Sequence, residues 1–266
     1  MLSRIALLIE YHGSAFHGWQ FQPNLSTVQG AIQAAIYQYC GQEVELHCAG
    51  RTDAGVHAVA QVAHVDLAGV HQPFRVMDAV NFYLRNGDFN FNNAHIKHDF
   101  ANKVAIINAQ SVPDSFHARF SAKSRRYQYR VIIRRSPLVL EHGLAWRIQS
   151  ELDMDAMREA AQMMLGEHDF NSFRSGDCQA KNSIKKLDIL EIIQVGEHII
   201  FNVKAKSFLH NQVRIMAGTL VQIGKGLYPP SVISQMFAGN HRRCAGMTAP
   251  AEGLFFMEVE YDDLSW

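Results

Sequence analysis

Apolar and polar positions along this 266-residue chain predict strands and helices in succession. Residues 5–9 form a short, continuous apolar run, which is typical of a buried strand. Between residues 28 and 39 the apolar side chains recur at three- and four-residue spacing, which predicts one face of a helix. Ser26 and Gln29 stand at the spacing of a capping box, so we expect the helix to begin there. The chain therefore opens with a strand and a helix.

The same reasoning predicts a series of further elements. Strands are expected over residues 44–49, from the next loop to residue 66, and over 104–109, 127–133, 145–148, 186–193, 199–205 and 254–261. Helices are expected over residues 74–84, from Asp153 to a cap at Gly166, and over 211–223 and 230–239.

Residues 85–103 have no clear periodicity and are rich in Asn, Asp and His, so we expect an exposed excursion from the core. The spacing of His95 and His98 within it would suit a metal, but no third ligand is evident, and we expect both to be surface residues without a metal.

These elements fall into two runs of similar rhythm that meet near residues 112–114. We predict an α+β fold of two similar domains, each with an antiparallel sheet backed by helices. The predicted domains are residues 1–111 and residues 112–266.

Composition agrees with a globular protein, since 48% of the residues are hydrophobic and 19% are charged. The four cysteines are widely spaced without a CxxC pair, so we expect small buried thiols in a reducing compartment. No cleavable signal sequence is evident, and no apolar run approaches the ~18 residues of a membrane span. These features predict a cytoplasmic protein without a membrane association.

Charge is unevenly placed although the formal net charge is zero. Residues 119–135 include seven basic side chains and no acidic one, with Tyr127 and Tyr129 interleaved. Such a segment suits phosphates, and its aromatic side chains suit base stacking; the alternative is a solvated strand face. The chain has no P-loop, no GxGxxG after a strand, no HExxH and no GxSxG, so we expect neither nucleotide hydrolysis nor a redox cofactor.

One loop between two apolar runs concentrates candidate chemistry. Gly50 and Gly55 allow backbone angles that a Cβ disfavours, and Asp53 lies between them, two residues from Arg51. The loop would let a ligand approach the backbone while Asp53 faces it. The simpler interpretation is a turn in which Asp53 caps the start of a helix.

The loop GRTDAGVHA (residues 50–58) resembles the catalytic loop of the tRNA pseudouridine synthase A family. Six further segments match that family in the same order along almost the whole chain: IEYHGSAFHGWQ (9–20), TVQGAI (27–32), FHARFSAKSRRYQYR (116–130), LGEHDFNSFR (165–174), FLHNQVRIMAG (208–218) and APAEGLFF (249–256). The chain departs from the family at His12, where Asp is common, and at residues 81–85, which replace a Leu-Asn-x-x-Leu-Pro segment. The region up to residue 103 is also longer than in the family.

The resemblance implies that Asp53 is the essential carboxylate in converting uridine to pseudouridine, either as a nucleophile or as a base. It further implies that Arg214 pairs with this aspartate and that Tyr127 stacks on the target uracil. Arg51 would help to hold the flipped-out nucleotide, and Leu254 would line the uracil pocket. The active site would lie in a cleft between the two domains.

The implied substrate is tRNA, with uridines 38–40 of the anticodon stem-loop as targets, and the implied assembly is a homodimer that needs no cofactor. RNA would bind the basic segment through Arg119, Lys123, Arg125 and Arg126. Two other hypotheses stay open: a tRNA-binding module or chaperone without catalysis, and an aspartate-dependent glycosidase or hydrolase. The second of these would need another positioned carboxylate.

Overall fold

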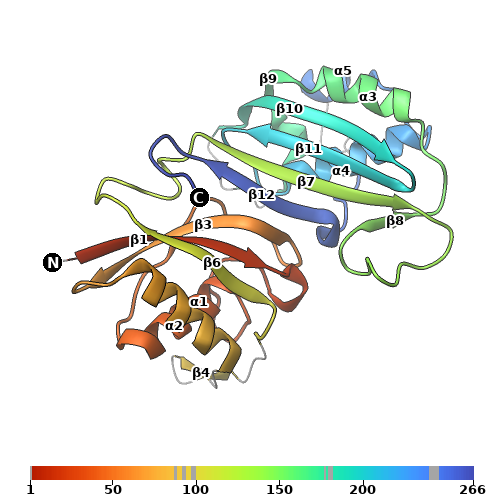
Figure 1. Cartoon of the computed structure of the whole chain (residues 1–266). Coiled ribbons are helices and arrows are strands. Elements are labelled where there is room, and N and C mark those ends of the chain that lie inside the picture. The colour runs from red at the N-terminus through yellow and green to blue at the C-terminus, as the bar shows by residue number, and fades with distance from the viewer. Residues whose placement is uncertain are drawn as a thin grey trace. The chain divides into compact units, whose positions relative to one another are not determined.

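In a computed structural model the chain divides into two compact units (Figure 1). The structure describes residues 2–86, 89–91, 94–96, 100–176, 178, 182–239 and 246–266. Unit 1 consists of residues 1–123 and 256–266, and unit 2 consists of residues 124–255. The sequence predicts one domain boundary, near residue 112. The compact units have two boundaries, after residues 123 and 255, because the C-terminal residues belong to unit 1.

The sheet of unit 1 is antiparallel and has β1 at its centre. Its strands are β1 (Leu2–Tyr11), β3 (His57–Ala68) and β6 (Val104–Ser111). In the register of β1, Ile5 lies opposite Val65 of β3, and Leu7 lies opposite Ala109 of β6. The run expected as a strand over residues 44–49 forms only β2 (His47–Cys48), which pairs with β3.

Two helices of unit 1, α1 (Val28–Cys40) and α2 (Pro73–Asn86), lie on one face of this sheet (Figure 1). The predicted capping box is not formed. Thr27 is the cap and accepts a hydrogen bond from the Gly30 backbone N–H, while the Gln29 side chain binds backbone groups elsewhere in unit 1. The interface between these two helices and the sheet is apolar as expected. No exposed surface remains on Ile32 of α1, on Val76 of α2 or on the inward side chains of β1 and β3.

Part of the predicted excursion is a short antiparallel pair, β4 (Phe89–Phe91) with β5 (Ala94–Ile96). Its Asn- and His-rich composition gave no strand periodicity, because three residues are too few to show one. The side chains of His95 and His98 lie outside what the structure describes. Within the described part of the chain, no three His, Cys, Asp or Glu side chains are grouped so that they could hold a metal ion.

Unit 2 contains an antiparallel sheet in the order β7 (Ser124–Ile133), β11 (His198–Ala205), β10 (Ile184–Val195) and β9 (Gly166–Asp169). The short β8 (Trp146–Ile148) pairs in parallel with β7. Three helices pack on one face of the sheet: α3 (Met154–Met163), α4 (Gln212–Gly224) and α5 (Val232–Phe237) (Figure 1). The last strand, β12 (Leu254–Glu260), crosses the boundary between the units. The α+β class is thus confirmed.

The structure also bears on three smaller predictions, which concern the ends of α3, the cysteines and membrane-spanning helices. Asp153 caps α3 as expected, accepting from two backbone N–H groups, but the helix ends at Met163 with Met164 as its cap, and Gly166 begins β9. The described cysteines, Cys40, Cys48 and Cys178, are free thiols in partly exposed residues, not fully buried ones. Among the described residues, no helix is both long and apolar enough to span a membrane.

Candidate functional site

The Asp53 loop connects β2 to β3 and is tied to β3 by its backbone. Gln61 donates to the carbonyl of Gly50 (2.7 Å), and the Ala49 N–H donates to the carbonyl of Val62 (2.8 Å). The Val56 N–H donates to the carbonyl of Asp53 (3.2 Å), which closes a turn. A strand and not a helix follows this turn, so the interpretation of Asp53 as a helix cap is wrong.

Thr52 anchors the loop to the segment that follows β1. Its buried hydroxyl lies 2.7 Å from that of buried Tyr11, and its carbonyl accepts from the Trp19 N–H (3.0 Å). Gly18 makes this approach possible, because a Cβ there would lie 2.8 Å from the Thr52 carbonyl oxygen and the residue has φ +91°. With Thr52 held inward, Asp53 stays half-exposed and the residue before Thr52 is exposed. That residue, Arg51, lies on the same loop as Asp53, as the sequence predicted.

The end of the loop rests on a second close approach. The Gly13 N–H donates to Nδ1 of buried His57 (3.1 Å), and a Cβ at Gly13 would lie 2.2 Å from the carbonyl oxygen of Val56. His12, at the position where the family commonly has Asp, meets His57 edge-on with ring centroids 4.5 Å apart. Burial lowers the pKa of His12, and Lys103 lowers it further. The imidazole of His12 is therefore neutral near pH 7.

Two other groups beside the loop are unsuited to proton transfer. Burial raises the pKa of Tyr11 far above its usual range. The residue Cys48 is partly exposed, but its sulfur lies inward, and this burial raises the pKa of the thiol to about 12. Both stay protonated near pH 7. The half-exposed Asp53 side chain is the remaining candidate among these groups for nucleophilic or general-base chemistry.

Arg214 lies in the first turn of α4 and is held by main-chain and side-chain oxygens. Its Nε donates to the carbonyl of Ala249 (2.8 Å), and its Nη1 donates to Oδ1 of Asn211 (2.7 Å). Asn211 precedes the helix in the left-handed conformation, at φ 61°. The Ala249 N–H in turn donates to the carbonyl of Arg214 (3.1 Å). The half-buried guanidinium is thus fixed in place, unlike that of a solvated surface arginine.

The predicted uracil-contacting residues of unit 2 are both largely buried. Tyr127 is 8% exposed on β7, with its ring edge-on to Phe208 at 5.2 Å. Leu254, 6% exposed, begins β12 directly after the short 3₁₀ helix η4 (Ala251–Gly253). Gly253 is required there, since a Cβ would lie 2.7 Å from Cζ of Tyr129. Arg214, Tyr127 and Leu254 belong to unit 2, whereas Arg51 and Asp53 belong to unit 1.

The expectation that Tyr129 offers a surface for base stacking is wrong. The side chain has no exposed surface, and its hydroxyl donates to the carbonyl of Pro250 (2.8 Å). Its ring packs edge-on against Phe201 and Trp146. Tyr129 is a core residue of unit 2, because alternate positions of β7 face the interior.

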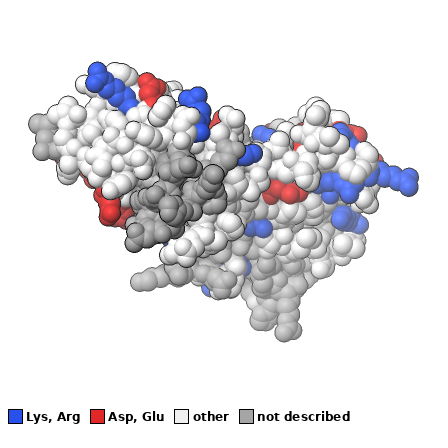
Figure 2. Space-filling view, turned by 90° about the horizontal axis from the view of Figure 1, so that it is seen from below, with Lys and Arg blue, Asp and Glu red and all other residues white. Residues whose placement is uncertain are grey.

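The same alternation splits the basic segment. Arg125 shares the buried face of β7, and its Nη1 donates to the carbonyl of Lys206 (2.6 Å). Arg126 and Arg130 lie on the opposite, half-exposed face. The guanidinium of Arg130 lies 3.7 Å from the centroid of the Phe255 ring, and burial lowers its pKa. The seven residues are therefore not one uniform surface. On the face drawn in Figure 2, the Lys and Arg side chains of the chain form separate groups, with uncharged and acidic residues between them.

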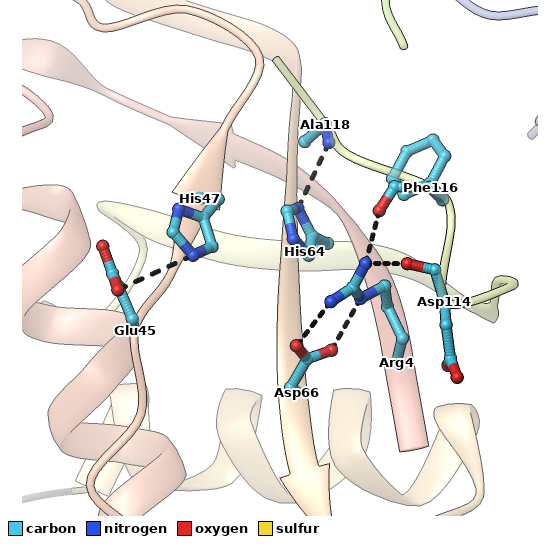
Figure 3. Close-up of polar contacts among 8 residues, drawn as sticks. All are labelled: Arg4, Glu45, His47, His64, Asp66, Asp114, Phe116 and Ala118. Carbon is cyan, nitrogen blue, oxygen red and sulfur yellow. Dashed lines mark hydrogen bonds and ion pairs between the residues drawn. The ribbon is translucent and has the colours of Figure 1, made fainter. Parts of the chain in front are cut away.

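Arg119 and Lys123 are exposed on the connection between β6 and β7. This connection is anchored to unit 1 by the guanidinium of Arg4, which bonds the carboxylate of Asp66 (2.6 Å) and the carbonyls of Asp114 and Phe116 (Figure 3). The connection also carries Phe120, an exposed aromatic side chain that sequence reasoning missed. Periodicity gives no signal for such a residue, because it lies outside any helix or strand.

Comparison with known proteins gives full-length matches. A family model described as tRNA pseudouridine synthase matches residues 7–121 and 160–262. The tRNA pseudouridine synthase A of Wolbachia sp. subsp. Drosophila simulans (strain wRi) is 43% identical over 259 residues, which covers 97% of this chain and 100% of that protein. The protein of the same name from Bradyrhizobium sp. (strain BTAi1) is 44% identical over 260 residues, covering 98% and 100%. A chain in the crystal structure of a Cbf5-Nop10-Gar1 complex aligns with TM-score 0.34 and 11% identity, covering 97% of this chain and 60% of that one, which is too low to support an argument.

Proposed function

Since the chain belongs to the tRNA pseudouridine synthase family, we propose that it isomerises uridines 38–40 of the tRNA anticodon stem-loop with Asp53 as the essential carboxylate. Family membership makes the protein a tRNA-modifying isomerase. In the reaction the N1–C1′ bond of uridine breaks, a C5–C1′ bond forms, and the proton on C5 is lost while N1 gains one. Product and substrate are isomers, so the atoms balance without a second substrate.

One observation carries the role of Asp53: its loop is clamped on both sides while its own side chain stays half-exposed. Tyr11 and Trp19 hold Thr52, and Gly13 packs against Val56. A carboxylate on such a loop is held in position before substrate binds, which lowers the entropic cost of reaching a reactive geometry. Asp53 then acts on the extracted nucleoside, at uracil C6, at ribose C1′ or on the C2′ proton.

The other site residues have proposed roles that agree with their surroundings. Arg214, fixed by Asn211 and Ala249, would pair with the Asp53 carboxylate and hold its side chain in one orientation. Tyr127 would stack on the uracil, and Leu254 would form an apolar wall of the same pocket. Arg51, exposed on the Asp53 loop, would contact the nucleotide after it leaves the stem.

For RNA docking we propose Arg119, Lys123 and Arg126, whose side chains are exposed or half-exposed. Arg125 is buried against the Lys206 carbonyl, so we assign it a structural part beneath that surface. Lys123 already pairs with the carboxylate of Asp262 (2.5 Å), and a phosphate would compete for it. We further propose that the protein works as a homodimer in the cytoplasm.

The experiment is tritium release from tRNA transcripts labelled at uridine C5. One transcript carries uridines at positions 38–40, and a matched transcript carries cytidines there with all other uridines kept. The proposal predicts release from the first transcript only, without added nucleotide or metal. Equal release from both would reject the anticodon stem-loop as the target. Binding of both transcripts without any release would favour the non-catalytic tRNA-binding module.

A further inference from the structure

An exposed aromatic side chain, Phe120, lies beside Arg119 on the connection between β6 and β7. Phe120 is 77% exposed, and the guanidinium carbon of Arg119 lies 5.7 Å from the centroid of its ring. A single exposed apolar side chain is ordinary on a protein surface. Phe120 differs from such a side chain because ring contacts and backbone hydrogen bonds hold the residues around it in place.

Three imidazole rings lie beneath this segment. His47 on β2, His64 on β3 and His117 form a histidine cluster in which ring centroids lie 4.8–5.3 Å apart. His117 contacts the Phe120 ring directly, with centroids 4.4 Å apart and an angle of 36° between the planes. Phe120 is therefore supported by a cluster of contacting rings that begins in the sheet of unit 1.

Backbone hydrogen bonds fix the orientation of this cluster. The Ala118 N–H donates to Nδ1 of His64 (3.2 Å), and the Arg119 N–H donates to Nδ1 of His117 (3.1 Å) (Figure 3 shows the first). Because Nδ1 accepts in both rings, the proton of each neutral imidazole lies on Nε2. The first bond holds the segment 117–120 to β3, and the second fixes the His117 ring within the segment, so the exposed ring has a defined position before any ligand arrives.

Within the histidine cluster, His64 and His117 contribute ring surface and little charge near pH 7. Burial lowers the pKa of His64 to about 4, and burial together with the neighbouring His47 lowers the pKa of His117. The positive charge next to Phe120 comes instead from the guanidinium of Arg119. An exposed ring beside one guanidinium matches a nucleotide, whose base stacks on aromatic side chains and whose phosphate binds arginine.

We propose that Phe120 is a stacking platform for an unpaired base of the bound tRNA, with Arg119 on the phosphate of that base or its neighbour. The inference rests on the proposed function and adds a contact separate from those assigned to the target uracil. A protein partner fits less well, because Phe120 is flanked along the chain by Arg119 and Ser121 and does not continue an apolar run.

The experiment measures the affinity of the full chain for unmodified tRNA transcript, in wild type and in Phe120→Ala, Phe120→Leu and Phe120→Trp. Loss of one stacked base predicts about 5- to 150-fold weaker binding for Phe120→Ala. Leucine keeps apolar surface without a ring face and should bind as weakly as alanine, whereas tryptophan should bind like wild type. The matched control is Phe74→Ala, since Phe74 is 55% exposed with the Arg75 guanidinium 5.9 Å from its ring and lies in α2.

Phe120→Ala binding within twofold of wild type would overturn the proposal, and so would full rescue by leucine. A change from dimer to monomer in sedimentation would reassign Phe120 to a subunit contact and overturn it as well. Tritium release separates this proposal from the function. If wild type releases tritium and Phe120→Ala binds normally, the stacking contact alone fails. If wild type releases none while Phe120→Ala binds weakly, the stacking contact stands and the synthase assignment fails.

Discussion

The hydroxyl pair that anchors the Asp53 loop can be tested by a double-mutant cycle on Tyr11 and Thr52. Tyr11 is 3% exposed and Thr52 is 8% exposed, and their oxygens lie 2.7 Å apart. Tyr11→Phe or Thr52→Val removes one hydroxyl and leaves the other buried without this partner. An unsatisfied buried hydroxyl costs about 1–3 kcal/mol, so each single variant should lose about that much free energy of unfolding.

The double variant should be more stable than the sum of the single effects. With both hydroxyls gone, two apolar side chains of unchanged shape meet, and such a replacement is close to neutral. Because the two single losses of about 1–3 kcal/mol add up while the double loss is near zero, the cycle predicts a coupling free energy of about 2–6 kcal/mol between the two positions. Because Thr52 adjoins Asp53, Thr52→Val should also lower kcat for pseudouridine formation.

Urea unfolding of the four proteins measures the cycle, and tritium release measures kcat. Tyr37→Phe is the matched control: Tyr37 is 39% exposed, so its hydroxyl can bond water and its loss should change the free energy of unfolding by less than about 0.5 kcal/mol. Strictly additive single effects would show that the two hydroxyls do not stabilise each other. The account of how the loop is clamped would then be wrong.

Two further predictions concern the same unit. Gly13→Ala should lower both stability and kcat, because its Cβ would lie 2.2 Å from the Val56 carbonyl. The control is Gly176→Ala, whose Cβ would meet nothing within 4 Å and which should lower neither. Equal thermal unfolding temperatures of the two variants would contradict this. Burial lowers the pKa of His64 from 6.5 to about 4, so the unfolded chain takes up a proton at higher pH than the folded one. The contribution of neutral His64 to the free energy of unfolding should be complete above pH 6.5. It should fall by at most about 3 kcal/mol as the pH drops to 4. His64→Asn should lose less stability over that window in urea unfolding, and an equal loss would refute the assignment.

The sequence predicts the fold best where apolar periodicity is long. Residues 5–9 and the stripe through Ile32 correctly mark β1 and α1, because both elements bury most of one side. It fails where packing between distant segments decides. The run at 44–49 is apolar enough for a strand, yet only His47 and Cys48 pair with β3. In the sequence, Gly166 could equally well cap a helix or begin a strand. It begins β9 because that segment pairs with β10.

For the site, the sequence identifies residue types but not exposure. It places Asp53 between two glycines correctly, but the approach of Gly13 and Gly18 to that loop appears only in three dimensions. The consecutive Arg125 and Arg126 carried a usable signal, since neighbours on a strand face opposite sides. The sequence carries no such signal for Phe120. The position of its ring depends on the histidine cluster, whose members are far apart in the sequence.

The most direct test of the role of Asp53 compares wild type with Asp53→Asn in parallel assays of tRNA affinity and tritium release. Asparagine keeps the size of the side chain and removes the charge, so the clamped loop should keep its conformation. The account predicts tRNA binding within several-fold of wild type and no release above background. Release at a rate near that of wild type would contradict it and remove Asp53 as the catalytic carboxylate.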